Sequence, residues 1–170
     1  ILYGWRETAQ STASNQDAKP YAHGAGRDAL DAHLKRKYGA GAWAEDAAYT
    51  FVYKARFDTL KQQPLVSTII PIKDKARLTA QCVRSILQKS SYHNYEILIL
   101  DNRSVKAQTF RWFESIKKAD PRIRVLKADF EFNWSKINNF GMEQANGDVY
   151  ILLNNDTVVI SENWIERLCE

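Results

Sequence analysis

From residue 65 onward, short apolar runs alternate with longer segments in which apolar residues recur every three or four positions. The short runs have the length of buried strands, and the longer segments have the period of helices that pack on one face. A strand, a helix and a further strand in this order form a right-handed crossover between parallel strands. We therefore predict an α/β fold with a mostly parallel, doubly wound sheet flanked by helices. The predicted strands cover residues 65–70, 95–100, 123–126 and 149–153, and the predicted helices cover residues 75–89, a segment after Ser104, residues 135–146 and a segment after Ser161.

The same patterns predict how the elements end and which side chains face the core. Pro71 is expected to end the first strand, and Ser104 and Ser135 are expected to cap the helices that follow them. Trp134 is interpreted as a core residue. Apolar residues at helical spacing are expected on the buried helix faces. They are Leu78, Cys82, Val83, Ile86 and Leu87 in the first of these helices, Phe110, Phe113 and Ile116 in the second, and Trp164, Ile165 and Leu168 in the last.

Polar residues follow three of the predicted strands directly. Any one such cluster is also typical of a turn. Because the carboxyl ends of parallel strands share one edge, where ligands of open α/β sheets bind, three clusters together favour a site for a nucleoside diphosphate. The clusters are Pro71, Lys73 and Asp74 after the first strand, Asp101 and Asn102 after the second, and Asn154, Asn155 and Asp156 after the fourth.

Two carboxylates in these clusters have distinct expected roles. Asp101 could accept hydrogen bonds from a base or from ribose hydroxyls. Asp156 stands in an oxygen-rich setting that suits a hard cation such as Mg²⁺ or Mn²⁺. Lys136, near the start of a predicted helix, is a weaker candidate for a diphosphate contact. No G-x-G-x-x-G sequence follows the first strand, which argues against a dinucleotide-binding site.

Composition excludes some partners and leaves others open. The net charge of +4 fits phosphate-bearing ligands or an anionic membrane surface, and solvated basic side chains explain it equally well. No basic run is dense enough to predict nucleic-acid binding. Cys82 and Cys169 lack metal-ligand spacing, and Cys82 is expected to be a reduced core thiol. No signal peptide or membrane span is evident, so we expect a cytoplasmic protein, with peripheral contact at the inner face of the cell membrane left open.

Residues 1–63 differ in character from the rest of the chain. They are polar and rich in small residues, with a predicted helix at residues 26–38 and a predicted strand at residues 49–57. We predict a small, loosely attached appendage or linker that proteases cut first between residues 11 and 24.

Four segments, taken together, resemble family 2 glycosyltransferases of the GT-A fold: residues 66–74, 94–104, 132–141 and 152–157, in the expected order. The resemblance implies an inverting transferase that uses a UDP- or dTDP-sugar with Mg²⁺ or Mn²⁺. It implies that Asp101 contacts the nucleoside, that Asn139 lies near the nucleotide, and that Asn154, Asn155 and Asp156 occupy the family's Asp-x-Asp-type metal motif. This variant of the motif resembles the rhamnosyltransferase-like members.

The resemblance also implies how the chain fits into a longer protein. Residues 64–170 resemble the N-terminal, nucleotide-sugar-binding half of a transferase domain, so the general base is expected beyond Glu170 and this chain alone is expected to transfer no sugar. Residues 1–63 resemble the segment that joins tandem transferase domains in large bacterial surface-polysaccharide enzymes, which act on glycan or lipid-linked acceptors. A non-catalytic GT-A-like domain that binds a nucleotide or partner proteins is the alternative.

Overall fold

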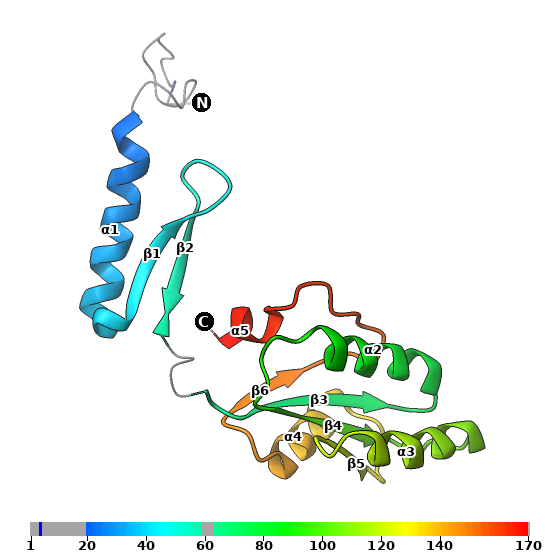
Figure 1. Ribbon diagram of the computed structural model, residues 1–170. Coiled ribbons are helices and arrows are strands. Elements are labelled where there is room, and N and C mark those ends of the chain that lie inside the picture. Colours follow the sequence, from blue (N-terminus) through cyan, green and yellow to red (C-terminus); the bar gives the residue numbers. More distant parts are fainter. Residues whose placement is uncertain (1–3, 5–19, 59–62, 170) are drawn as a thin grey trace. The chain divides into compact units, whose positions relative to one another are not determined.

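The computed structural model describes residue 4 and residues 20–58 and 63–169. The chain divides into two compact units with a boundary at residues 59–60, and Figure 1 labels their elements. Most of the stretch where proteolysis is expected, residues 11–19, lies outside the described residues. Within the described ranges, no helix is long and apolar enough to cross a lipid bilayer.

The leading unit is a helix followed by a two-stranded antiparallel hairpin. Its helix begins earlier than the predicted start at Gly26 and ends where Gly39 adopts a φ of 79°. The first strand of the hairpin was not predicted, and the second is shorter than predicted because residues 48–51 form the connecting turn. The elements are α1 (Pro20–Tyr38), the 3-10 helix η2 (Gly39–Gly41), β1 (Ala42–Asp46) and β2 (Tyr53–Phe57).

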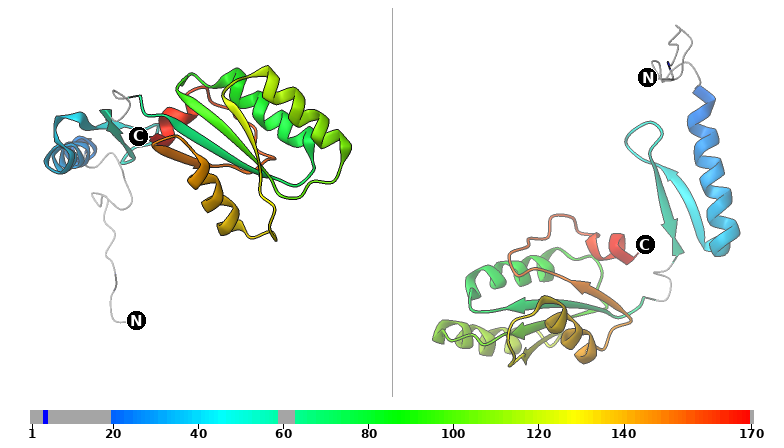
Figure 2. Two further views of the ribbon diagram at one scale, coloured as in Figure 1. Left: turned by 90° about the horizontal axis from the view of Figure 1, so that it is seen from below. Right: turned by 180° about the vertical axis from the view of Figure 1, so that it is seen from behind.

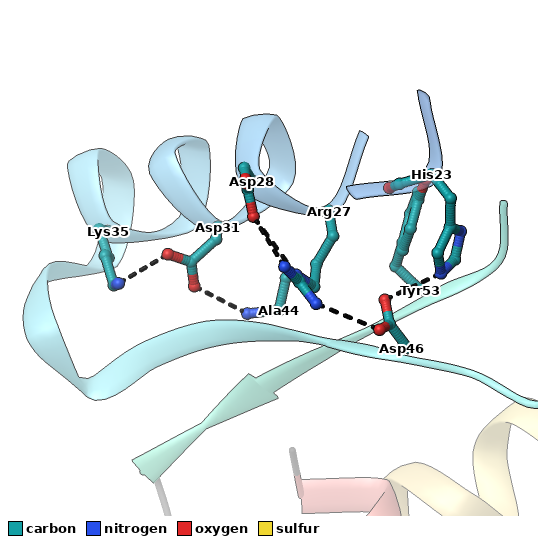
Figure 3. Close-up of polar contacts among 8 residues, drawn as sticks. All are labelled: His23, Arg27, Asp28, Asp31, Lys35, Ala44, Asp46 and Tyr53. Atoms are coloured by element: carbon teal, nitrogen blue, oxygen red, sulfur yellow. Dashed lines mark hydrogen bonds and ion pairs between the residues drawn. The ribbon is translucent and has the colours of Figure 1, made fainter. Parts of the chain in front are cut away.

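Polar contacts join α1 to this hairpin (Figure 3). The Asp31 carboxylate accepts a hydrogen bond from the backbone N–H of Ala44 at 3.0 Å and pairs with Lys35 at 2.6 Å. The Arg27 guanidinium lies 3.2 Å from the carboxylate of Asp46 on β1. Charged side chains thus supply much of the connection between helix and hairpin.

His23 makes the second connection between α1 and the hairpin. Its Nδ1 accepts a hydrogen bond from the backbone N–H of Phe51 at 2.9 Å, so the neutral ring carries its hydrogen on Nε2, which faces Asp46 at 3.1 Å. The imidazole also stacks on the ring of Tyr53 (Figure 3). Gly26 of α1 lies against Tyr53, and a side chain at this position would clash with the Tyr53 hydroxyl.

The second unit has the predicted α/β architecture. Its four strands are all parallel and lie in the order β5-β4-β3-β6. Helices α2 and α3 lie on one face of the sheet and α4 on the other (Figure 2, left). The elements are β3 (Val66–Ile72), α2 (Ala76–Lys89), β4 (Tyr95–Asp101), α3 (Ala107–Ala119), β5 (Ile123–Lys127), α4 (Trp134–Gln144), β6 (Val149–Leu152) and α5 (Trp164–Cys169).

Alternate residues of the central strands form two separate cores. Val66, Ile70 and Ile72 of β3 pack with the apolar face of α2, while Ile69 packs toward α4. A Cβ at Gly141 of α4 would lie 2.6 Å from a methyl group of Ile69, so this glycine permits the close approach of helix and sheet.

Three of the apolar residues predicted to lie on the buried helix faces are exposed. Leu78 of α2 is 44% exposed, Phe110 of α3 45% and Leu168 of α5 63%. The neighbouring predicted residues Cys82, Val83, Ile86, Phe113 and Ile165 are buried as expected.

Pro71 lies inside β3 rather than ending it, opposite Leu100 of β4. The carbonyl of Ile69 accepts from the N–H of Leu153, so Ile69 and Pro71 both direct their backbone groups toward β6. Pairing with β6 reaches only to Ile69, and the missing N–H of Pro71 therefore breaks no hydrogen bond in the sheet.

The helix caps differ from those predicted. Helix α4 begins after Asn133, whose side chain accepts from the N–H of Lys136 at 2.9 Å, and Ser135 is not the cap. Helix α3 begins after Lys106 rather than Ser104. The Ser104 hydroxyl accepts instead from the N–H of Asp74 at 2.7 Å.

Asp74, which adopts a φ of 56°, caps α3 indirectly, by binding the two residues that precede the helix. Its Oδ1 accepts from the N–H groups of Lys106 at 2.9 Å and Val105 at 3.1 Å, and from the Thr109 hydroxyl at 3.2 Å. Hydrogen bonds from Lys106, Val105 and Thr109 hold the pKa of Asp74 below its ordinary value. The loop after β3 is thereby tied to the loop after β4.

Glu96 forms a buried polar cluster at the amino end of the sheet. Its carboxylate accepts from the N–H of Asn146 at 2.6 Å, the Ser67 hydroxyl at 2.7 Å and Arg124 at 3.2 Å. The Ser67 hydroxyl in turn accepts from the N–H of Gly147 at 2.9 Å. Burial alone would raise the pKa of Glu96, but these hydrogen bonds bring it below its ordinary value. The cluster joins β3, β4 and β5 to the chain that enters β6.

Replacing Glu96 with glutamine is expected to destabilise the protein by about 1.5–3 kcal/mol near neutral pH, the usual contribution of a hydrogen bond to a charged group. Because the pKa of Glu96 is lowered on folding, its contribution is present above the ordinary value of 4.5 and is lost as the pH falls through the lowered pKa. Urea unfolding should therefore show the two proteins converging at acid pH. Glu143→Gln, on the exposed face of α4, is the control, and a constant gap at every pH would contradict the role of the Glu96 charge.

Replacing Asp74 with alanine is expected to lower Tm by several degrees, because three donors at the start of α3 lose their acceptor. Asp74→Asn keeps an oxygen acceptor and should retain most of the wild-type Tm. Thermal unfolding followed by circular dichroism measures both. Asp129→Ala is the matched control, because the Asp129 carboxylate is 57% exposed and pairs only with surface cations in the described chain. Equal losses in Asp74→Ala and Asp129→Ala would argue against the cap.

Candidate functional site

The loops at the carboxyl ends of β3, β4 and β6 border a pocket of about 290 Å³. These three strands are adjacent and parallel, so their ends meet at one edge of the sheet. The structure brings together five of the residues predicted from the sequence, namely Pro71, Lys73, Asn102, Asn154 and Asn155.

Four further lining residues were not predicted as site residues: Ile72, Lys75, Phe132 and Trp134. Trp134 is 46% exposed rather than a core residue, and Phe132 is 61% exposed. Lys73 and Lys75 place positive charge beside these rings. Phe132 and Trp134 flank Asn133 in residues 132–141, one of the segments that carry the family resemblance. Their place in that segment is the sequence feature that could have identified them as site residues. The pocket combines the features that an anion with an attached planar group requires.

Asn102 lines the pocket although only 3% of its surface is exposed. Its side-chain NH₂ donates to the backbone carbonyls of Ala128 at 2.8 Å and Phe130 at 2.9 Å. These contacts fix the chain segment that leads from β5 to Phe132. Asn102 therefore shapes the pocket wall through its internal hydrogen bonds.

Asp101 faces the opposite side of the sheet from Asn102, because successive side chains of a strand alternate. It lines a second pocket of about 520 Å³ beside Phe110 and Phe113 of α3. Its Oδ1 accepts from the N–H of Ser104 at 3.0 Å. Asp101 thus belongs to the same loop cluster as the first pocket but not to its lining.

Lys136 and Asn139 lie on α4, away from the first pocket. They line a third hollow of about 540 Å³ with Phe130, Phe140 and Glu143. The Lys136 ammonium lies over the Phe130 ring, 4.6 Å from its centroid. Asp74 is also absent from the lining of the first pocket in the described chain, and its contacts are those of a helix cap.

The segment after β6 carries Asp156 in an exposed turn. The Asp156 side chain has no hydrogen bond or ion pair with the part of the chain that the structure describes. The Cys82 thiol donates to the backbone carbonyl of Asn154 at 3.8 Å. Burial, together with the nearby charge of Asp156, raises the pKa of Cys82 to about 11. As predicted, Cys82 is a buried free thiol.

A divalent cation fits this turn only with help from a ligand. Among residues 20–58 and 63–169, no three His, Cys, Asp or Glu side chains are grouped so that they could hold a metal ion. Mg²⁺ and Mn²⁺ are commonly held by one or two carboxylates together with phosphate oxygens and water. Asp156 and the amide oxygens of Asn154 and Asn155 fit such a ligand-completed site.

Residues 67–170 match the model of a family described as Glycosyl transferase family 2. An uncharacterized protein of Sinorhizobium fredii is 39% identical over 168 residues, which is 99% of this chain and 18% of that protein. The O-antigen biosynthesis protein RfbC of Myxococcus xanthus is 35% identical over 167 residues, which is 98% of this chain and 13% of that protein. The chain thus spans less than a fifth of the length of either relative.

Two solved structures have a similar fold at low sequence identity. The mannosyltransferase PcManGT of Pyrobaculum calidifontis, in complex with GDP-Man and Mn²⁺, superposes with a TM-score of 0.55 at 16% identity, over 90% of this chain and 41% of that one. Residues 1–349 of TarS from Staphylococcus aureus give a TM-score of 0.52 at 19% identity, over 61% of this chain and 30% of that one. With its parallel sheet and the family match over residues 67–170, the chain belongs to glycosyltransferase family 2 and has the GT-A fold.

Proposed function

We propose that residues 64–170 bind the nucleotide-sugar donor of an inverting glycosyl transfer in the pocket lined by Lys73, Lys75, Phe132 and Trp134. The observation that carries the proposal is the position of this pocket, beside the exposed carboxylate turn at Asp156 and at the carboxyl edge of the sheet. Lysine ammonium groups suit a diphosphate, and exposed aromatic rings suit a base or a sugar ring.

Each group near the pocket has a defined task in this proposal. Lys73 and Lys75 attract the diphosphate, and Asp156 with Asn154 and Asn155 holds Mg²⁺ or Mn²⁺ against it. The cation, when bound, stabilises the charge of the departing diphosphate. The donor extends from this pocket into the second one, where Asp101 contacts the nucleoside. The chain's own residues thus bind and orient the donor for in-line displacement at its anomeric carbon.

The donor class follows from two observations. The resemblance to family 2 glycosyltransferases favours a UDP- or dTDP-sugar, and the Asn-Asn-Asp form of the metal motif resembles the rhamnosyltransferase-like members. PcManGT, whose fold is similar, holds GDP-Man and Mn²⁺. UDP, dTDP and GDP are therefore the nucleotides to compare.

The relatives suggest the setting of the reaction. RfbC is named for O-antigen biosynthesis, which supports a glycan or lipid-linked acceptor in bacterial surface-polysaccharide synthesis. Both long relatives align with nearly all of this chain, so the match includes most of residues 1–63. We infer that this leading segment joins the transferase domain to an adjacent domain of a longer protein.

A non-catalytic nucleotide- or partner-binding domain is the second candidate. It is favoured by the two amides in the metal motif, Asn154 and Asn155, which bind a hard cation more weakly than carboxylates do. The dependence of nucleotide binding on Mn²⁺ separates the two candidates.

Replacing Asp156 with alanine is expected to remove the Mn²⁺-dependent part of nucleotide binding. Calorimetry on the wild-type chain should show at least about fivefold tighter binding of one of the three nucleotides in Mn²⁺ than in EDTA, as expected for two coupled ligands. Asp156→Ala should bind equally in both. Asp148→Ala, at the amino end of β6, is the matched control and should keep the difference. Equal wild-type affinity in Mn²⁺ and EDTA would favour the second candidate.

Replacing Asp101 with asparagine is expected to weaken nucleotide binding in EDTA as well as in Mn²⁺, because the contact is with the nucleoside. The loss of a charged acceptor corresponds to about 1.5–3 kcal/mol. The amide keeps an oxygen for the N–H of Ser104, so the loop should persist and Tm should change little. An unchanged dissociation constant would exclude Asp101 from the site.

A further inference from the structure

Helix α2 carries a row of small polar side chains that hold the segment between β6 and α5. Thr79, Cys82 and Ser85 lie three residues apart and are 0%, 1% and 7% exposed. Each contacts a different part of the segment, which has no helix or strand of its own. The contacts are Asn155 Nδ2 to Thr79 Oγ1 at 3.3 Å, Cys82 Sγ to the Asn154 carbonyl at 3.8 Å, and the Val159 N–H to Ser85 Oγ at 2.9 Å.

The row continues past the end of α2. The Trp164 indole N–H donates to the Ser90 hydroxyl at 2.8 Å, and the Ser91 hydroxyl donates to the carbonyl of Glu162 at 2.9 Å. The segment therefore runs along the helix in the same direction, held from the site to α5. At the end of the segment nearest the pocket, the Asn155 side chain is held by Thr79.

The Thr79 hydroxyl makes two contacts. It donates toward the backbone carbonyl of Lys75 at 3.4 Å, and in this orientation its lone pairs face Asn155 Nδ2 at 3.3 Å. Only the NH₂ end of the Asn155 amide can meet these lone pairs. The Oδ1 end must then lie on the other side of the amide, and Asn155 lines the pocket.

We propose that Thr79 is a positioning residue that fixes the Asn155 amide with its oxygen available to the pocket. If the Asn155 amide were turned over, its NH₂ group would face the bound cation. The partial positive charge of that group would repel the cation. An aspartate at position 155 could bind Thr79 only if the hydroxyl turned its hydrogen away from the Lys75 carbonyl, so the relay from Lys75 through Thr79 to residue 155 fits asparagine. This inference rests on the proposed donor site, and it assigns to α2 a part in setting the affinity for the nucleotide with its cation.

Replacing Thr79 with valine removes the hydroxyl at nearly constant shape. Calorimetry with UDP, dTDP and GDP, each in Mn²⁺ and in EDTA, should show about tenfold weaker binding in Mn²⁺, the usual loss when a partner of a metal ligand is removed. Binding in EDTA should change little. Thr79→Ser restores the hydroxyl and should restore the wild-type ratio of the two dissociation constants. Thr79→Ala removes the same hydroxyl without a branched side chain and replaces the valine variant if that one does not fold.

Ser85→Ala is the matched control from the same row. It removes the acceptor of the Val159 N–H, farther along the segment, and should lower Tm while leaving the ratio unchanged. An unchanged ratio in Thr79→Val, or an equal fall in Ser85→Ala, would overturn the positioning role. A wild-type chain that binds none of the three nucleotides would overturn the proposed donor site, and this inference with it.

Discussion

The buried carboxylate of Glu96 fixes the position of the strands on which the rest of the second unit depends. It lies at the amino end of β4 and joins Ser67 of β3, Arg124 of β5 and the turn at Asn146 that starts β6. A single acceptor shared among four strands leaves little freedom for any of them to slip by one residue, which would turn each apolar side chain to the wrong face. Because the strands are parallel, a register set at the amino end also determines where the loops emerge at the opposite, carboxyl end.

Much of this unit could be predicted because its central strands, β3 and β4, are buried on both faces and appear as largely apolar runs. The cluster of Pro71, Lys73, Asn102, Asn154 and Asn155 could be predicted because these residues follow the ends of strands predicted to be parallel. The exceptions depend on contacts between residues distant in sequence. Asp74 bonds to backbone groups 31 and 32 residues later, and no local pattern indicates which of several candidate residues will cap α3.

The leading unit was harder to predict for a different reason. Patterns of apolar residues reveal elements that pack through hydrocarbon, whereas α1 and its hairpin are joined largely through Asp31, Arg27 and His23. Charged residues at such positions resemble an ordinary solvated face in the sequence. The helix at residues 26–38 was recognised in part from Leu30 and Leu34, of which Leu34 is buried. The strand β1, with Trp43 its only large apolar residue, offered no comparable pattern.

The position of Pro71 has a consequence for how β6 leaves the sheet. The next rung of the β3–β6 ladder would be a hydrogen bond from the N–H of residue 71 to the carbonyl of Leu153, and proline has no such hydrogen. The two strands can therefore part after Leu153 without losing a hydrogen bond donated by residue 71. Asn154, Asn155 and Asp156 are released from the sheet at that point, so their side chains are free of the alternation that a strand would impose. Because Pro71 of β3 has no N–H group, β6 can end at this point and be followed by a turn of three consecutive polar residues.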